Sequence, residues 1–231
     1  MVIGNGMLAT KFMSFNTMRE VVIFASGVSN SALQNNEGYA REAVLLAETI
    51  EANPNEMLVY FSTCSIYQPS LLQKKYVQHK LAMEALVQTN ASRYLLLRLS
   101  NPVGNTSNKH TVFNFFIEQL INKQPIMVWQ HAKRNLMDID DVFNVSAHII
   151  HNQLFKNEIV NIAHPKNFSV HEILQALEAH FKMTGNYTYI NEGDEPKIDL
   201  QKIMPVYKAV NVQFPEDYLY SLLQKYFSNE V

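Results

Sequence analysis

Residues 57–67, which read MLVYFSTCSIY, decide the fold of this chain. The apolar run at 57–61 has the length and the residue types of a strand that is buried on both faces. Polar residues follow it, then a helical pattern over residues 75–88 and a second apolar run over residues 94–99. Strand, helix and strand in this order predict a parallel pair joined by a crossover helix.

The same alternation continues on both sides of this unit and predicts an α/β fold. The predicted strands cover residues 1–3, 21–25, 57–61, 94–99, 126–129, 135–139 and 159–163. The predicted helices cover residues 7–15, 37–52, 75–88, 112–121, 170–181 and 218–226, and one more begins near Asp140. Residues 101–104 are predicted to be a loop, and the tail from Asp199 has a mixed pattern before its last helix.

The bulk composition is that of an ordinary globular protein. Of the 231 residues, 47% are hydrophobic and 17% are charged, and the net charge is −2. This charge gives no general attraction to nucleic acid or anionic membranes, and no apolar run approaches the roughly 20 residues that cross a bilayer. The N-terminus lacks the pattern of a secretory signal, and the single cysteine, Cys64, excludes an internal disulfide framework. We therefore expect a cytoplasmic protein.

A glycine-rich turn follows the first predicted strand. Residues 4–9 read GNGMLA, a GxGxxA pattern between a strand and a helix. Gly4 and Gly6 let the backbone turn tightly and approach a pyrophosphate, to which the start of the helix offers free N–H groups. A plain strand-to-helix turn would have the same pattern, so this motif alone leaves both interpretations open.

A tyrosine and a lysine lie four residues apart in YVQHK, residues 76–80. On a helix this spacing places Tyr76 and Lys80 on one face, where the ammonium group would lower the pKa of the phenol and let it exchange a proton near neutral pH. A solvated helix face is the alternative, because two more lysines directly precede the tyrosine. Thr63 lies where the buried strand ends, so its hydroxyl can share a hydrogen bond with a substrate and with a tyrosine of the next helix.

Together these segments resemble the extended short-chain dehydrogenases/reductases, the NAD-dependent epimerase/dehydratase family. The resemblance rests on segments that follow one another in the family's order. They are FASG (24–27), FSTCSIY (61–67), YVQHK (76–80), RLSNPVG (98–104), residues 124–142, NIA (161–163) and FSV (168–170). The resemblance implies a Rossmann-like, doubly wound parallel sheet with a small C-terminal substrate-binding annex. We expect the nicotinamide-cofactor core in residues 1–110, and the remaining core elements with the annex in residues 111–231, intertwined as one structural unit.

The resemblance also implies a role for each residue of the site. Tyr76 would be the general acid/base, Lys80 would hold the nicotinamide ribose and tune Tyr76, and Thr63 would hydrogen-bond the reacting carbonyl or hydroxyl. The residues implied for the cofactor, NAD or NADP, are Gly4, Gly6, Met7, Leu8, Ala25, Ser26, Gly27 and Lys80. Those implied for the substrate are Ser65, Asn101 and Arg134, of which the planar guanidinium of Arg134 suits a diphosphate.

The chain departs from the family's pattern in its cofactor half. Only about five residues separate the first predicted helix from the strand at 21–25, so the usual second and third strands are missing. The residue that binds the adenosine ribose normally lies on that stretch and is missing with it. Glu20 precedes its strand and does not take that role, so the choice between NAD and NADP stays open. Cys64 and Ser65 stand where the family's sugar dehydratases carry Asp-Glu, which argues against dehydration. We expect Cys64 to be a packing residue.

We therefore expect an oxidoreductase or epimerase that uses NAD or NADP to reduce a keto group of a nucleotide-linked sugar, or to epimerise such a sugar. The alternative is a catalytically silent cofactor-binding sensor or scaffold, which the missing segment favours and the presence of Thr63, Tyr76 and Lys80 opposes. A reductase for a substrate without a nucleotide is a third interpretation. The histidines show no ligand spacing, so we expect no metal. By analogy with the family we also expect a homodimer, through the helices at 39–52 and 75–88.

Overall fold

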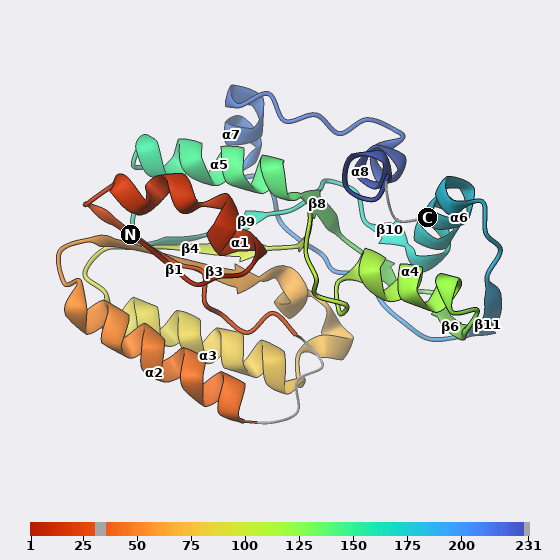
Figure 1. The fold of residues 1–231 in the computed structure, drawn as a ribbon. Helices are drawn as coiled ribbons and strands as arrows, with labels where there is room; N and C mark the ends of the chain where they lie inside the picture. Colours follow the sequence, from red (N-terminus) through yellow and green to blue (C-terminus); the bar gives the residue numbers. More distant parts are fainter. Residues whose placement is uncertain (31–35, 229–231) are drawn as a thin grey trace.

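A parallel sheet of five strands lies at the centre of the molecule (Figure 1). The computed structural model describes residues 1–30 and 36–228. The strands of the sheet stand in the order β1-β2-β3-β4-β9, and every neighbouring pair is parallel. Their bounds are Val2–Ile3, Val21–Phe24, Met57–Thr63, Tyr94–Leu99 and Glu158–Ile162. This arrangement confirms the predicted α/β class and its parallel sheet.

Helices cover both faces of this sheet, which is why its strands are apolar along their length (Figure 1). On one face lie α2 (Glu37–Ala52) and α3 (Lys75–Asn90), whose buried side chains pack against β2, β3 and β4. On the other face lie α1 (Met7–Lys11), α5 (Ile139–His151) and α7 (Met204–Ala209). All seven residues of β3 are buried, so the segment that decides the fold is also its central strand.

A smaller part of the molecule, on the right in Figure 1, has a hydrophobic core of its own. Its helices are α4 (Val112–Ile121), α6 (Val170–Phe181) and α8 (Tyr218–Tyr226). Its strand pairs are β6 (Pro125–Trp129) with β11 (Asn186–Ile190), and β7 (Lys133–Arg134) with β10 (Phe168–Ser169). A third pair joins β5 (Asn101–Val103) to β8 (Leu136–Asp138). Because α5 and β9 return the chain to the central sheet between these elements, the two parts alternate along the sequence.

The central sheet begins at β1, which pairs directly with β2. Among the described residues no strand lies on the outer side of β1, so the sheet is shortened as predicted, without the usual second and third strands. The N–H of Val2 instead donates a hydrogen bond of 2.6 Å to the Asn16 side chain. Asn16 belongs to a short 3-10 turn, Met13–Thr17, that covers part of this edge.

The predicted helix at 7–15 is shorter in the structure. Helix α1 ends at Lys11, and the 3-10 turn Met13–Thr17 follows it. Phe12 and Phe15 are buried, and both rings contact Phe143 of α5 at centroid distances of 5.1 and 6.2 Å. A tighter turn brings residues three apart onto one side, so this packing favours the 3-10 turn over a continued α-helix.

The predicted strand at 135–139 was too long. The Asp138 side chain accepts a hydrogen bond of 2.8 Å from the N–H of Asp140, and this cap starts α5 at Ile139. The predicted loop at 101–104 contains β5, and the mixed tail contains α7; β11 lies just before that tail. Strands β5 and β11 pair with β8 and β6. They lack a local strand pattern, because β5 has three residues with Asn101 and Pro102 and β11 is mostly exposed.

Candidate active site

A cleft of about 750 Å³ opens where β1, β2, β3 and β4 reach their carboxyl ends. Open parallel sheets bind their ligands at the carboxyl ends of their strands. The expected site residues that line the cleft are Gly6, Met7, Leu8, Ala25, Ser26, Gly27, Thr63, Ser65, Tyr76, Lys80, Asn101 and Arg134. Of the expected residues, Gly4 alone does not line it. The fold therefore gathers side chains from the first turn to β7 around one space.

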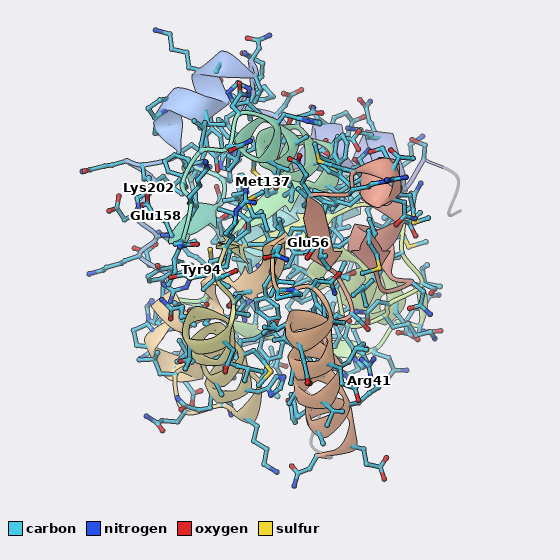
Figure 2. All side chains as sticks on the ribbon, turned by 90° about the vertical axis from the view of Figure 1, so that its left-hand side faces the viewer. Arg41, Glu56, Tyr94, Met137, Glu158 and Lys202 are labelled. Atoms are coloured by element: carbon cyan, nitrogen blue, oxygen red, sulfur yellow. The ribbon has the colours of Figure 1, made fainter. Side chains whose placement is uncertain are left out.

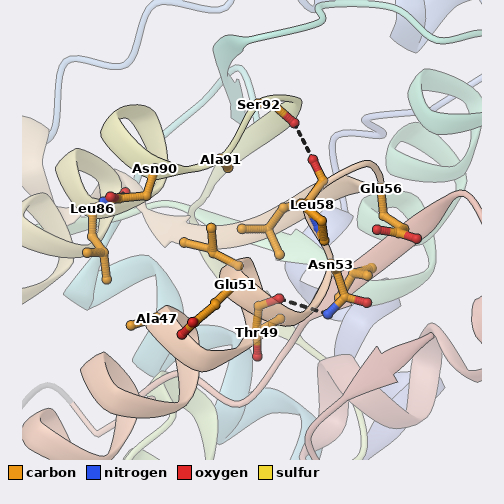
Figure 3. A pocket seen from close by; sticks show the side chains of 13 residues that line it. Ala47, Thr49, Glu51, Asn53, Glu56, Leu58, Leu86, Asn90, Ala91 and Ser92 are labelled. Carbon is orange, nitrogen blue, oxygen red and sulfur yellow. Dashed lines mark hydrogen bonds between the residues drawn. The ribbon is translucent and has the colours of Figure 1, made fainter.

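A second hollow of about 520 Å³ lies near the amino ends of β2 and β3, between the carboxyl ends of α2 and α3 (Figure 3). Three of its polar side chains donate hydrogen bonds to nearby backbone. Thr49 donates to the carbonyl of Leu45, Asn53 to the carbonyl of Thr49, and Ser92 to the carbonyl of Pro54. These side chains already have hydrogen-bond partners in the protein. The cleft at the carboxyl ends of the strands is therefore the better candidate for a site.

The glycine turn between β1 and α1 forms one end of the cleft. Gly4 has a φ of +128°, and a Cβ placed on it would lie 2.4 Å from the carbonyl oxygen of Ala25. Only glycine fits there, so Gly4 holds the turn against the end of β2. Gly6 has open space where a Cβ would be, so the backbone of the turn faces the cleft without cover.

Thr63 and Tyr76 both line the cleft. Thr63 is the last residue of β3, and its hydroxyl lies 3.0 Å from the Ser65 hydroxyl and accepts from the Ser65 N–H. Burial raises the pKa of Tyr76 to about 12, the nearby Thr63 hydroxyl opposes this rise, and the charge of Glu42 adds to it. The expectation that the phenol has a lowered pKa is therefore wrong for the protein alone, because burial raises this pKa and the Lys80 ammonium is paired with Glu42.

That partner is the carboxylate of Glu42 on α2. The Lys80 ammonium donates to Glu42 Oε1 at 3.0 Å, to the Tyr60 hydroxyl at 3.0 Å and to the carbonyl of Phe61 at 3.4 Å. These three bonds account for its three N–H groups. Burial lowers the pKa of Lys80, and Glu42 acts in the opposite direction. Gly27 leaves room for the ammonium group, since a Cβ there would lie 2.5 Å from it.

Glu42 is fully buried, and the sequence interpretation missed it. It accepts hydrogen bonds from the Tyr60 hydroxyl and from the N–H of Val28, both at 2.6 Å, and its other contact is His79 Nε2 at 3.0 Å. Burial alone would raise its pKa, but these partners and Lys80 lower it to about 2. Its position in the sequence could have revealed it. Glu42 lies in helical spacing with the buried residues of α2, and a carboxylate buried there needs a partner because an unpaired one would be costly.

The substrate side of the cleft contains Asn101, Arg134 and a buried serine. Asn101 donates to the carbonyl of Asn135 at 2.7 Å. Arg134 on β7 is half-buried, and burial lowers its pKa while the charge of Asp194 acts against this. Ser100 also lines the cleft, and its hydroxyl is buried without a hydrogen-bond partner in the described structure.

The charge of the cleft is positive, although the whole chain has a net charge of −2. Among the described residues that line it, Arg41 and Arg134 supply the positive charge, because the charge of Lys80 is compensated by Glu42, and there is no aspartate or glutamate. This arrangement favours a ligand with several negative charges, such as a dinucleotide or a nucleoside diphosphate.

Cys64 follows Thr63 in a 3-10 turn, Cys64–Tyr67, and is buried. Burial raises the pKa of its thiol well above the ordinary value, so a packing role fits it better than that of a nucleophile. Over residues 1–30 and 36–228, no group of three or more metal-ligating side chains is placed to hold an ion. In the same part of the chain, no helix has the length and apolar character needed to span a membrane.

A parallel sheet with a glycine turn and a cleft at its carboxyl edge defines a Rossmann-type protein. Residues 5–163 match the sequence model of the NAD-dependent epimerase/dehydratase family, and the chain belongs to this family, as its motifs predicted. No curated protein sequence matches the chain significantly.

Solved structures share the fold at low sequence identity. The UDP-glucuronic acid 4-epimerase of Bacillus cereus, a mutant solved with NAD and a fluorinated UDP-sugar, is 17% identical with a TM-score of 0.72, over 90% of this chain and 74% of that one. The UDP-glucose 4-epimerase of Thermotoga maritima, solved with UDP-glucose, is 17% identical with a TM-score of 0.69, over 95% and 81%. The protein RMD of Pseudomonas aeruginosa, complexed with NADPH, is 16% identical with a TM-score of 0.66, over 91% and 81%.

Proposed function

We propose that this protein is an NAD(P)-dependent enzyme that reduces a keto group of a nucleotide-linked sugar, or epimerises such a sugar. The observation that carries the proposal is that Thr63, Tyr76 and Lys80 line one cleft together with the glycine turn and Arg134. Membership of the family supports a nicotinamide cofactor. The solved relatives, which hold NAD, NADPH or UDP-linked sugars, support the same classes of ligand here.

The residues of the cleft fit a nicotinamide dinucleotide. Gly4 packs the turn against β2, and Gly6 leaves open space where a pyrophosphate would approach the backbone of Met7 and Leu8. The segment Ala25–Gly27 would form the wall beside it. The bound cofactor would supply or accept the hydride. The positive lining of the cleft and the absence of a carboxylate from its described residues suit the phosphates of such a ligand.

Tyr76 would donate a proton to the sugar oxygen during reduction, while Thr63 holds that oxygen by a hydrogen bond. The phenol is protonated at neutral pH, as a proton donor must be, and burial raises its pKa further, to about 12. Arg134 would bind the substrate diphosphate with its planar fork, and Ser65 and Asn101 would lie along the sugar. Cys64 and Ser65 provide no carboxylate beside Thr63, so a dehydratase is a weaker proposal than a reductase.

A catalytically silent cofactor-binding sensor or scaffold is the second candidate. The observation that favours it is the closed network of Lys80, whose N–H groups bond to Glu42, Tyr60 and Phe61. In this arrangement the ammonium group has no donor left for a ribose, which is the role that the family resemblance implies for it. The two candidates differ in turnover and not in cofactor binding.

Calorimetric titration of the purified protein with NADH and with NADPH tests cofactor binding first. We expect micromolar binding of at least one of them. If a folded sample binds neither cofactor, the protein is not an NAD(P)-dependent enzyme as it stands, and both candidates fail.

Replacing Tyr76 by phenylalanine tests the catalytic role. With a UDP-linked or dTDP-linked 4-keto sugar as substrate, we expect turnover to fall about 10²-fold or more, because the proton donor is lost, while cofactor affinity stays the same. Consumption of NAD(P)H measured by absorbance reports turnover. Tyr94→Phe, at the amino end of β4, is the matched control. Equal turnover in wild type and Tyr76→Phe would contradict the assignment, and cofactor binding without turnover on any tested sugar would favour the sensor.

A further inference from the structure

Asn135 is a residue of the cleft to which the sequence interpretation gave no role. It lies between β7 and β8, directly after Arg134, and is only 3% exposed. Its amide oxygen accepts the N–H of His164 at 2.9 Å. Its amide nitrogen donates to the carbonyl of His164 at 2.8 Å, to Asn167 Oδ1 at 2.8 Å and to the carbonyl of Lys166 at 3.3 Å. All the partners of this side chain therefore belong to the turn between β9 and β10.

This turn joins the central sheet to the smaller part of the molecule. It follows β9, a strand of the central sheet, and leads into β10. Strand β10 pairs with β7, where Phe168 stands opposite Arg134. The side chain of Asn135 therefore holds the strand that carries Arg134 against the carboxyl end of β9, in addition to the pairing of β7 with β10.

The contacts of Asn135 extend to two more residues that line the cleft. Its backbone carbonyl accepts the N–H of Asn101 at 3.1 Å and the side-chain amide of Asn101 at 2.7 Å. Its side-chain partner Asn167 donates in turn to the carbonyl of Pro196 at 2.8 Å. Asn101, Arg134 and Pro196 come from separate segments of the chain, and all three line the cleft. One buried residue thus connects three parts of the wall.

The amide of Asn135 has little capacity left to bind a ligand itself. Its two N–H groups serve the two acceptors at 2.8 Å, and its oxygen accepts from His164. Without this side chain, the buried N–H and carbonyl of His164 would lose their partner, so the turn and β7 would move to satisfy them. An effect of Asn135 on a bound substrate would therefore pass through Asn101 and Arg134.

We propose that Asn135 is a positioning residue, which fixes Asn101 and Arg134 relative to Thr63 at the end of β3 and so sets the affinity for the nucleotide-linked sugar. This inference rests on the proposed function, because it takes Asn101 and Arg134 to bind the substrate. It goes beyond that proposal, since the cleft could bind such a sugar whether or not this amide sets its geometry.

Kinetics and calorimetry on Asn135→Ala test the inference. With a UDP-linked or dTDP-linked 4-keto sugar and saturating NAD(P)H, we expect KM to rise about tenfold or more while kcat changes by less than about twofold. Calorimetric titration should show a loss of affinity of similar size for UDP-glucose or dTDP-glucose, because the diphosphate would lose a correctly placed Arg134. The affinity for NAD(P)H should stay the same, since the glycine turn is not connected to Asn135.

Asn157→Ala is the matched control. The Asn157 side chain accepts the N–H of Tyr94 at 2.9 Å and so links the turn before β9 to the amino end of β4. Figure 2 faces this side of the molecule and labels Tyr94 and Glu158 there. The variant should unfold at a lower temperature than wild type and should keep both KM and kcat. A loss of stability is thereby separated from a loss of position.

An unchanged KM in folded Asn135→Ala would overturn the inference. So would an equal loss of affinity for NAD(P)H and for the nucleotide sugar, or a fall in kcat alone, and in these cases wild-type turnover still supports the proposed function. If Asn135→Ala does not fold, Asn167→Ala, which removes the bonds to Asn135 and Pro196, should raise KM about threefold or more. A wild type that binds neither NAD(P)H nor a nucleotide sugar would contradict the proposed function and this inference together.

Discussion

At the residue scale, the most unusual feature of the site is the buried carboxylate of Glu42. It compensates the charge of Lys80 and is itself held by Tyr60, Val28 and His79. Two charges removed from water need such a complete set of hydrogen bonds, because desolvation otherwise exceeds their mutual attraction. The network therefore fixes where Lys80 lies, and through Lys80 it also decides the electrostatic surroundings of Tyr76.

Glu42→Gln should destabilise the protein by roughly 3–5 kcal/mol near neutral pH, because Lys80 would remain buried without its carboxylate partner. The pKa of Glu42 is about 2 in the folded protein against an ordinary value of 4.5. Its stabilisation is thus fully present above pH 4.5 and is lost as the pH falls toward 2. The difference in unfolding free energy between wild type and variant should shrink over this range.

Urea unfolding at a series of pH values measures this difference. Glu48→Gln, at an exposed position of the same helix, is the matched control and should change stability by less than about 0.5 kcal/mol. If Glu42→Gln is as stable as wild type at neutral pH, the ion pair with Lys80 makes no net contribution to the fold.

At the scale of elements, the turn between β1 and α1 has two glycines with different tasks. Gly4 is required by the backbone, because its φ is +128° and the Ala25 carbonyl occupies the place of a Cβ. Gly6 has an ordinary φ of −81° and open space around it, so the chain itself does not require a glycine there. A glycine at position 6 is instead needed to leave room for the pyrophosphate of the nicotinamide cofactor that we propose.

The two alanine variants should therefore behave differently. Gly4→Ala should lower the free energy of unfolding by more than about 1 kcal/mol, because of backbone strain and the collision with β2. Gly6→Ala should leave stability unchanged or slightly raised and should weaken NAD(P)H binding, because its methyl group enters the space above the turn. Thermal unfolding and calorimetry on both variants measure these effects. Full cofactor affinity in Gly6→Ala would place the pyrophosphate elsewhere.

At the scale of the whole molecule, α2 and α3 lie side by side and cover one face of the sheet (Figure 1). The outward surface of α2 includes Val44, whose side chain is 58% exposed. We expect this surface to form the homodimer contact, as two such helix pairs would bury each other's apolar side chains.

Sedimentation tests the assembly. Wild type should sediment as a dimer at micromolar concentration, and Val44→Arg should sediment as a monomer, because a charge would be buried in the contact. Met204→Arg, at an exposed apolar position on α7, is the control and should remain a dimer. A monomeric wild type would remove the expectation.

The sequence by itself determined the class of fold, the family and part of the lining of the cleft. Apolar runs such as 57–61 and segments such as YVQHK can be recognised from local sequence. Because ligands bind at the carboxyl ends of parallel strands, the order of these segments also predicts where the site lies. The bounds of α2, α6, α8 and β4 follow from local periodicity in the same way. The strands β5 and β11 were missed because β5 has only three residues, which include Asn101 and Pro102, and because β11 has no buried apolar pattern. Only the tertiary structure decided the state of Lys80 and Tyr76, since Glu42 comes from a different helix and its effect depends on burial and distance, which no local spacing contains.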